Sequence, residues 1–289
     1  MAKSICMKAY WNILVPGIND MNDYLKFGKE SVLKAGKHLL ERQDKVQKIK
    51  DKFGGADILT TADKESEQII TAIIHKNFPS HAIFSEEAGE IYGGNDLQWV
   101  MDPLDGTKHY IKGLPFFAVS LVLRNQKEPL LSFTFIPVTN ELFISEKDNG
   151  ATYNGKICKV SSEENIANAI IYVEFPSTRF KINWKKEDYD RAWRLYENLT
   201  RACFRTRAYG SGPIGMVYTA MGGFDAYVRF QPLSYEDVLG GSLMIKEAGG
   251  KITDQYGNDV EMKGNELDTR LVASNGKIHE QILKVLRGL

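Results

Sequence analysis

The spacing of apolar residues along the chain changes from a helical period to a strand period. Between residues 19 and 50, apolar side chains recur among charged ones at Leu25, Val32, Leu33, Leu39, Leu40 and Val46. This spacing predicts an amphipathic helix that stops before Gly54-Gly55. A second helix is predicted to begin near Asp63 and to stop at Phe78-Pro79, with its apolar face formed by Ile69, Ile70, Ile73 and Ile74.

The following stretch alternates with a period of two. Strands are predicted over residues 82–84, 99–101, 118–123, 130–136 and 141–145. Asp148-Asn149-Gly150 and Asn154-Gly155 predict the tight turns of a β-meander.

The rest of the chain mixes both periods. Strands are predicted over 170–175, 226–230 and 271–274, and helices over 189–201, 215–221, 237–248 and 278–286. We therefore expect a layered α/β (α+β) fold. It divides near residues 150–165 without a flexible linker, into an N-terminal α+β region (1–155) that carries most candidate metal ligands and a C-terminal α/β region (156–289).

Composition narrows the class of protein. With 43% hydrophobic residues in 289, the chain can bury a core, which excludes general disorder. Lysine plus arginine and aspartate plus glutamate both number 37, so we expect no nucleic-acid partner bound by bulk charge. Three scattered cysteines and no long apolar segment predict a cytoplasmic protein without a membrane contact.

The densest chemical signal is Trp99-Val-Met-Asp102-Pro-Leu-Asp105-Gly-Thr107. Two carboxylates on one turn at the end of a strand repel each other unless a cation or proton lies between them. Such hard oxygen ligands suit Mg²⁺. Gly106 would let backbone amides approach a bound anion. Asp-Pro and Asp-Gly are also ordinary turn dipeptides, so the grouping carries the prediction rather than either pair alone.

Acids recur at the ends of other elements. Glu86-Glu87 follows a short predicted strand, where a surface pair is the simpler interpretation. Asp63 lies at the predicted start of a helix, where it would serve as the N-cap. Asp237 lies at another helix start, where the helix dipole stabilises acids in any case.

These motifs together resemble the inositol monophosphatase family, within the Mg²⁺-dependent, lithium-sensitive phosphatase superfamily. They occur in the family's order: Asp57-x-x-Thr60-x-x-Asp63, Glu86-Glu87, Trp99-x-x-Asp102-Pro-Leu-Asp105-Gly-Thr107, and Asp237-Val to Glu247-Ala-Gly-Gly250. The resemblance implies an α-β-α-β-α sandwich of the inositol monophosphatase/fructose-1,6-bisphosphatase type, commonly a homodimer.

The resemblance also implies a ligand set for two to three Mg²⁺ ions. Glu86, Asp102 and the Leu104 carbonyl would hold one ion, and Asp102, Asp105 and Asp237 a second, with Glu86 reaching a weaker third. Thr107, oriented by Asp63, would position and deprotonate the attacking water together with Glu86. Phosphate would lie against Gly106 and Thr107, and the small-residue turn Gly210-Ser211-Gly212 would contact the substrate.

The chain departs from the family pattern in three places. His109-Tyr110 replaces an Asn-Phe pair. Glu236 separates Tyr235 from Asp237, so Glu236 is the fallback ligand. Arg229 replaces the carboxylate that recognises ring hydroxyls in inositol phosphatases. An arginine could bind a second phosphate or a carboxylate, or form only a surface salt bridge.

We therefore predict an Mg²⁺-dependent phosphomonoesterase that acts on a small phosphorylated metabolite, with inositol monophosphate as the default substrate. Fructose 1,6-bisphosphate, 3′-phosphoadenosine 5′-phosphate and histidinol phosphate are alternatives, and Arg229 and Lys108 favour the doubly anionic ones. A non-catalytic regulator that binds phosphate or metal is a more distant alternative. Metal-activated water needs no nucleophilic cysteine or catalytic histidine, and the chain has no H-E-x-x-H motif or P-loop.

Overall fold

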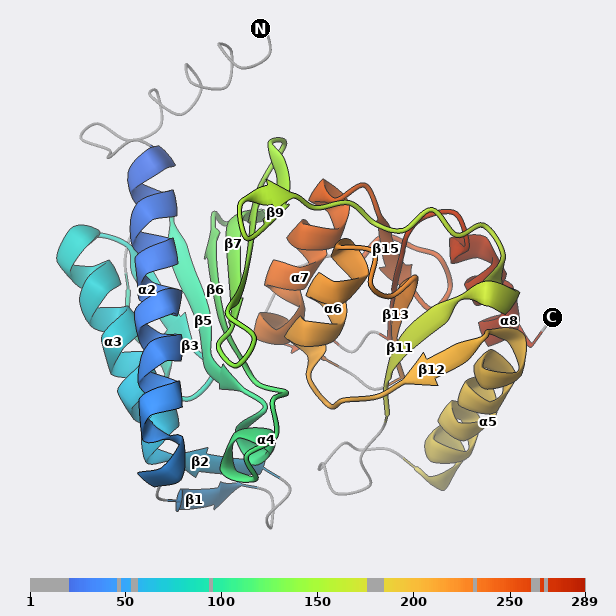
Figure 1. Cartoon of the computed structure of the whole chain (residues 1–289), viewed down its shortest axis with the longest axis horizontal. Helices are drawn as coiled ribbons and strands as arrows, with labels where there is room; N and C mark the ends of the chain where they lie inside the picture. Colours follow the sequence, from blue (N-terminus) through green and yellow to red (C-terminus); the bar gives the residue numbers. More distant parts are fainter. Residues whose placement is uncertain are drawn as a thin grey trace, which may run out of the picture.

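The structure, a computed structural model, forms five layers that alternate between helices and sheets (Figure 1). It describes residues 21–45, 48–52, 57–93, 96–175, 185–230, 233–260, 266–267 and 270–288, without the side chains of 48–52, 57–58, 233–237 and 266–267. Helices α2 and α3 cover an eight-stranded sheet, α6 and α7 fill the middle, and α5 and α8 cover the outer face of a five-stranded sheet. This arrangement confirms the predicted α-β-α-β-α sandwich.

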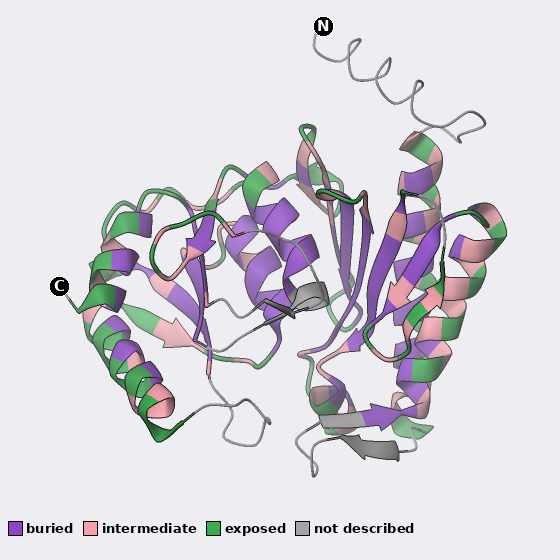
Figure 2. Ribbon diagram, turned by 180° about the vertical axis from the view of Figure 1, so that it is seen from behind, coloured by how far each residue is buried: buried purple, intermediate pink, exposed green. Residues whose placement is uncertain are grey.

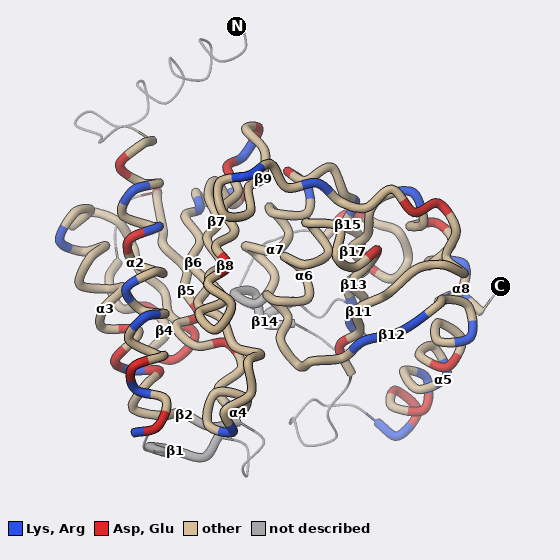
Figure 3. The backbone as a smooth tube through the Cα atoms, viewed as in Figure 1, with Lys and Arg blue, Asp and Glu red and all other residues tan. Residues whose placement is uncertain are grey.

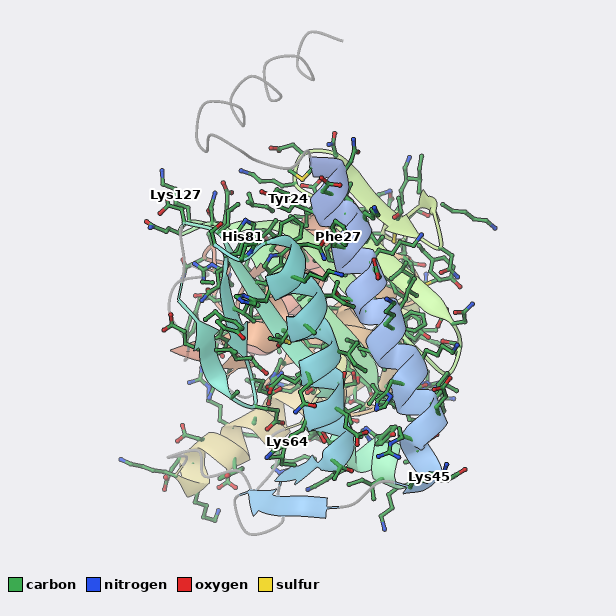
Figure 4. The ribbon with its side chains drawn as sticks, turned by 90° about the vertical axis from the view of Figure 1, so that its left-hand side faces the viewer. Tyr24, Phe27, Lys45, Lys64, His81 and Lys127 are labelled. Atoms are coloured by element: carbon green, nitrogen blue, oxygen red, sulfur yellow. The ribbon has the colours of Figure 1, made fainter. Side chains whose placement is uncertain are left out.

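The first layer pairs α2 (Met21–Arg42) with α3 (Thr61–Asn77), which lie side by side in Figure 4. Their apolar faces bury Val32, Leu39, Ile70 and Ile74 against the sheet. The predicted stop at Phe78 is confirmed, since Phe78 is the C-cap of α3.

The first predicted helix is too long. Helix α2 ends at Arg42, and after a short 3-10 turn (Gln43–Lys45) strand β1 (Lys48–Lys52) pairs antiparallel with β2 (Asp57–Thr60). Strand pairing therefore uses the backbone groups that a longer helix would have bonded internally. Leu40, expected on the apolar face, is 43% exposed. Val46 and Gly54-Gly55 lie outside the described residues.

The second helix also begins differently from the prediction. Thr60, not Asp63, is the N-cap of α3, because its side chain accepts hydrogen bonds from the backbone of the first turn. Asp63 is the third helical residue, and its carboxylate accepts a hydrogen bond from the Thr60 backbone N–H at 2.9 Å. The two side chains thus form a reciprocal capping box.

The eight-stranded sheet contains the predicted meander. Its strand order is β10-β9-β8-β7-β6-β5-β3-β4, antiparallel except between β3 and β5. The bounds are β3 Ala82–Ser85, β4 Gly89–Tyr92, β5 Gln98–Asp105, β6 Ala118–Arg124, β7 Pro129–Ile136, β8 Glu141–Glu146, β9 Gly150–Tyr153 and β10 Lys156–Ile157. Positive φ angles at Asp148, Gly150, Asn154 and Gly155 confirm both predicted turns.

The middle layer ties the two sheets together. Helices α6 (Gly212–Ala220) and α7 (Tyr235–Glu247) are buried between them and appear purple in Figure 2. At the last turn of α7, the Glu247 carboxylate accepts hydrogen bonds from the backbone N–H groups of Asp148 (2.8 Å) and Gly150 (2.9 Å), in the β8–β9 turn. The hydrophobic core around α6 and α7 contains residues from before and after position 155. The predicted division of the chain into 1–155 and 156–289 stays a prediction.

The five-stranded sheet has the order β12-β11-β13-β17-β15, parallel among its first three strands and antiparallel elsewhere. Its bounds are β11 Ile170–Glu174, β12 Arg205–Arg207, β13 Ala226–Arg229, β15 Lys251–Asp254 and β17 Leu271–Ser274. Helices α5 (Lys186–Ala202) and α8 (His279–Arg287) cover its outer face, and β14 (Leu233–Ser234) pairs with β16 (Glu266–Leu267). None of the described helices is long and apolar enough to span a membrane.

A buried aromatic cluster joins α2 to the first sheet. Tyr24, Phe78, His81 and Trp99 lie within 5.0 to 6.5 Å of one another by ring centroid, and Figure 4 shows Tyr24 and His81 at the same end of the layer. The Trp99 indole N–H donates to His81 Nδ1 at 3.0 Å. Burial lowers the pKa of His81 from 6.5 to about 4, so the native imidazole is neutral at physiological pH.

This burial predicts a pH-dependent loss of stability. Below pH 6.5 the unfolded chain takes up a proton that native His81 does not, so the free energy of unfolding falls as the pH drops toward 4. His81→Asn retains an acceptor for Trp99 but cannot titrate, so it should lose about 2 kcal/mol less than wild type between pH 7 and pH 5. Urea denaturation at the two pH values measures this difference, and equal losses would contradict the role of His81.

Candidate active site

The predicted acidic motif lies at the carboxyl end of β5, where the strand is irregular. Asp102 pairs with Ser120 of β6 and Asp105 pairs with Ala118, so three steps along β5 match two along β6. This bulge redirects the chain between the two aspartates. Asp102 is only 4% exposed, and its Oδ1 accepts a hydrogen bond from the Leu104 N–H at 3.0 Å. Asp105 is partly exposed.

Gly106 makes the turn that follows. Its φ is +82°, and a side chain there would bring a Cβ within 2.4 Å of the Phe116 carbonyl oxygen. Glycine is therefore required both for the backbone conformation and for the close approach. The short helix α4 (Thr107–Ile111) begins directly after it.

Asp63 and Thr107 meet although 44 residues separate them. Thr107 Oγ1 lies 3.0 Å from Asp63 Oδ1 and 3.1 Å from the Leu104 carbonyl oxygen, so it can donate to either. Asp63 Oδ2 accepts from the side chain and the backbone N–H of Thr60. Burial, at 1% exposure, raises the pKa of Asp63, while these hydrogen bonds partly oppose the rise.

Glu86 follows the strand next to β5. Its backbone N–H donates to the Met101 carbonyl at 3.1 Å, which extends the parallel pairing of β3 with β5. Its side chain is exposed, whereas the preceding Ser85 is buried and donates to Glu67 on α3. Glu86 and Asp102 therefore lie next to each other at the carboxyl ends of two neighbouring parallel strands, β3 and β5.

The loop before α6 reaches the acidic motif from the other half of the chain. Ser211 is the N-cap of α6, and its hydroxyl donates a hydrogen bond to Asp105 Oδ2. The Tyr172 hydroxyl, buried on β11, contacts both backbone groups of Ser211: it accepts from the N–H at 3.0 Å and can donate to the carbonyl at 2.9 Å. Gly210 lies against His109 of α4. The predicted turn 210–212 is therefore adjacent to the acidic motif.

Arg229 lies behind this turn in a buried ion pair. It is opposite Glu174 in the β11–β13 register, with Arg229 Nη1 3.9 Å from Glu174 Oε2, and it is 8% exposed. The sequence suggested a surface salt bridge as one role of Arg229. The ion pair is present, but it is buried and not on the surface. A Cβ added to Gly212 would lie 3.5 Å from Arg229 Nη1, so the guanidinium is close to the turn 210–212.

Among the side chains that the structure describes, no group of three or more His, Cys, Asp or Glu residues is close enough to hold a metal. Asp237, in the first turn of α7, and the fallback Glu236 have side chains outside this description. The described donors are nonetheless hard oxygens: the carboxylates of Asp102 and Asp105 and the Leu104 carbonyl on one bulged turn. This donor set fits a divalent cation such as Mg²⁺.

Two residues beside the site were not predicted from the sequence. Tyr172 and Glu174 occupy alternate positions on β11, and the Tyr172 hydroxyl lies 3.4 Å from Glu174 Oε1. The sequence did contain a sign of Glu174, because this acid follows the apolar strand residues Ile-Ile-Tyr-Val. Asp102 follows an apolar strand in the same way, and it was identified by that pattern.

Comparison with known proteins covers nearly the whole chain. The sequence profile of the inositol monophosphatase family matches residues 20–289. A Nus factor SuhB from Vibrio cholerae is 32% identical, covering 92% of this chain and 97% of its own. A fructose-1,6-bisphosphatase/inositol-1-monophosphatase from Aquifex aeolicus is 31% identical, covering 93% of this chain and 97% of its own.

Solved structures show the same fold. The extragenic suppressor protein SuhB from Bartonella henselae superposes with a TM-score of 0.83 at 26% identity, covering 92% of this chain and 98% of its own. The inositol monophosphatase of Thermotoga maritima superposes with a TM-score of 0.79 at 28% identity, covering 92% and 97%.

Removing the Tyr172 hydroxyl should weaken the junction between the two sheets. Tyr172→Phe leaves the buried N–H and carbonyl of Ser211 without this partner, which should lower the free energy of unfolding by about 1–3 kcal/mol. Tyr153→Phe is the matched control, because its hydroxyl binds Glu141 at a more exposed position. Urea denaturation compares the two variants, and an equal or smaller loss in Tyr172→Phe would contradict the assignment.

Proposed function

Because the chain belongs to the inositol monophosphatase family, we propose that it is an Mg²⁺-dependent phosphomonoesterase that hydrolyses a small polyol or sugar phosphate. Family membership supports the coarser statement, a phosphatase. The observation that carries the finer proposal is the buried Thr107–Asp63 hydrogen bond beside the bulged Asp102–Asp105 turn.

We assign the ion-binding roles as follows. Glu86, Asp102 and the Leu104 carbonyl would hold one Mg²⁺, and Asp102, Asp105 and Asp237 a second, with Glu86 available to a third. When bound, such ions lower the pKa of water and neutralise charge on the attacking and leaving oxygens. Asp105 would keep its orientation through the hydrogen bond from Ser211.

The remaining residues would accept the proton of the attacking water and bind the phosphate group. Thr107 donates its hydroxyl proton toward Asp63, so its lone pairs can accept a proton from the attacking water. Burial raises the pKa of Asp63, which makes this carboxylate a better proton acceptor than an exposed aspartate. Glu86, exposed at the neighbouring strand end, would share in activating the water. The Gly106 and Thr107 amides, at the turn into α4, would bind the phosphate oxygens.

The substrate proposal remains a small phosphate ester, with inositol monophosphate as the default. Arg229, near the turn 210–212, favours substrates that carry a second anionic group, such as fructose 1,6-bisphosphate. Two relatives at 30–31% identity are named for both activities, the Aquifex aeolicus protein and one from Thermotoga maritima. 3′-Phosphoadenosine 5′-phosphate and histidinol phosphate are the other candidates. We also propose a cytoplasmic homodimer.

A second candidate function comes from the names of other relatives. Proteins called Nus factor SuhB, from Vibrio cholerae, Pasteurella multocida and Escherichia coli, are 30–32% identical over 92% of this chain. A Nus-factor role would be a regulatory function on the same scaffold. The sequence-based expectation of no nucleic-acid partner therefore stays a prediction. Phosphate release from the candidate substrates, with and without Mg²⁺ and Li⁺, separates an enzyme from a purely regulatory protein.

Asp102→Asn should abolish phosphate release. The change removes a carboxylate proposed to be shared by both ions, and we expect kcat/KM to fall at least about 100-fold, since each lost 1.4 kcal/mol of transition-state stabilisation costs about tenfold. Asp96→Asn, the same change at an exposed position, is the control. Phosphate assays with Mg²⁺ measure both variants, and near-normal activity in Asp102→Asn would refute the two-ion assignment.

Arg229→Ala should alter the choice of substrate. If the guanidinium binds a second anion, kcat/KM for fructose 1,6-bisphosphate should fall at least about tenfold more than for inositol monophosphate, because a charge-assisted hydrogen bond contributes about 1.5–3 kcal/mol. Arg229→Ala also leaves the buried carboxylate of Glu174 without this partner, which lowers the stability of the fold. The ratio of kcat/KM for the two substrates, measured in one preparation, does not depend on how much of the protein is folded. Equal losses on both substrates would exclude the role.

A further inference from the structure

A cleft on the outer face of the second half is lined by arginines. It has a volume of about 380 Å³ and lies between α5, the carboxyl end of α8 and the turn after β15. Arg191 and Arg194 line it from α5, and Arg287 lines it from α8. This volume is within the range of small-molecule sites, about 300–1,000 Å³. No aspartate or glutamate is among the residues that line it.

Four acids on the surrounding elements have other described partners. Three form ion pairs with lysines or arginines outside the cleft: Asp190 with Lys186, Glu197 with Arg201, and Glu280 with Lys251. The Asp254 carboxylate folds back onto its own turn, where it accepts from the Tyr256 N–H at 2.7 Å. Figure 3 shows both signs of charge along α5, so the positive cleft is a local arrangement and not a property of the whole helix.

The described residues that line the cleft include three arginines and no carboxylate. No ion pair or hydrogen bond joins the side chain of Arg191 or Arg194 to another described residue. Arg287 Nη2 donates to the Tyr256 carbonyl at 2.7 Å, which fixes the guanidinium at the cleft wall. Like charges lining a concave surface with apolar residues such as Leu195 and Leu286 concentrate a positive field there.

We propose that this cleft binds the diphosphate group of a small phosphorylated ligand. A guanidinium presents a planar pair of N–H donors that matches phosphate oxygens, and charge-assisted bonds of this kind are the stronger ones. A phosphomonoester carries about 1.5–2 negative charges near neutral pH, which leaves three arginines partly unbalanced, and the added charge of a second phosphate completes the balance. The Asn198 side chain can add a neutral donor, and Tyr256, 54% exposed, offers a ring on which a planar group can stack.

The proposal is independent of the proposed enzymatic function. The cleft lies on the side of the five-stranded sheet that α5 and α8 cover, whereas the acidic motif lies at the end of β5 in the first sheet (Figure 1). Binding here can therefore be measured without Mg²⁺ and without turnover.

The test is calorimetric titration of the full chain with inorganic pyrophosphate in the presence of EDTA. We expect one saturable site per chain, with an affinity that weakens as salt is added. The double change Arg191→Gln and Arg194→Gln should weaken binding at least about tenfold, since it removes two charge-assisted contacts. Arg201→Gln is the matched control, because Arg201 is on the same helix but pairs with Glu197 outside the cleft.

Three results would overturn the proposal: no saturable binding, unchanged affinity in the double variant, or an equal loss in Arg201→Gln. Asp102→Asn should bind pyrophosphate as wild type does, and a change of affinity in either direction would instead place the ligand at the candidate active site, where removing a carboxylate alters the repulsion of an anion. ADP distinguishes the source of the diphosphate. Tighter binding of ADP than of pyrophosphate, abolished by Tyr256→Leu, identifies a nucleotide, and equal affinities identify recognition of the diphosphate alone.

Discussion

The buried carboxylate of Asp63 connects the parts of the molecule that meet at the candidate site. One of its oxygens closes the capping box that starts α3, and the other accepts from Thr107 after the β5 bulge. Burying a carboxylate is costly unless its oxygens are hydrogen-bonded, and Thr60 and Thr107 supply those bonds. The start of a helix, the end of a strand and the turn into α4 are thus fixed relative to one another by a single side chain.

Periodicity in the sequence predicts the elements that are long or strongly apolar. The meander strands and α3 follow directly from alternating or helical spacing, and so does the sandwich class through the ordered acid motifs. The end of α2 did not follow, because four of the five residues of β1 are lysine or aspartate and its strand character comes from pairing with β2. Local spacing also suggested Asp63 as the N-cap, whereas the Thr60 hydroxyl three residues earlier takes that position.

The site was predictable where its residues are neighbours in sequence and not where they meet through sheet register. Asp102, Asp105, Gly106 and Thr107 share one turn, so their grouping was visible in the chain. The Arg229–Glu174 pair depends on β11 lying parallel to β13, and the contact of Tyr172 with Ser211 depends on how α6 enters the middle layer. Net charge also gave no information about where the charges lie, since a neutral chain places acids at the end of β5 and three arginines in the cleft between α5 and α8.

The hydrogen bond from Ser211 to Asp105 also bears on the order in which the molecule can be assembled. The strands of the first sheet follow one another closely in sequence, so their pairing requires little loop closure and can precede most of the second half. Asp105 and Ser211, in contrast, are 106 positions apart. A chain emerging from the ribosome can therefore hold the complete acidic turn while the second wall of the site has yet to be synthesised. The contact between Asp105 and Ser211 can form only after the carboxyl-terminal half has been made and has docked.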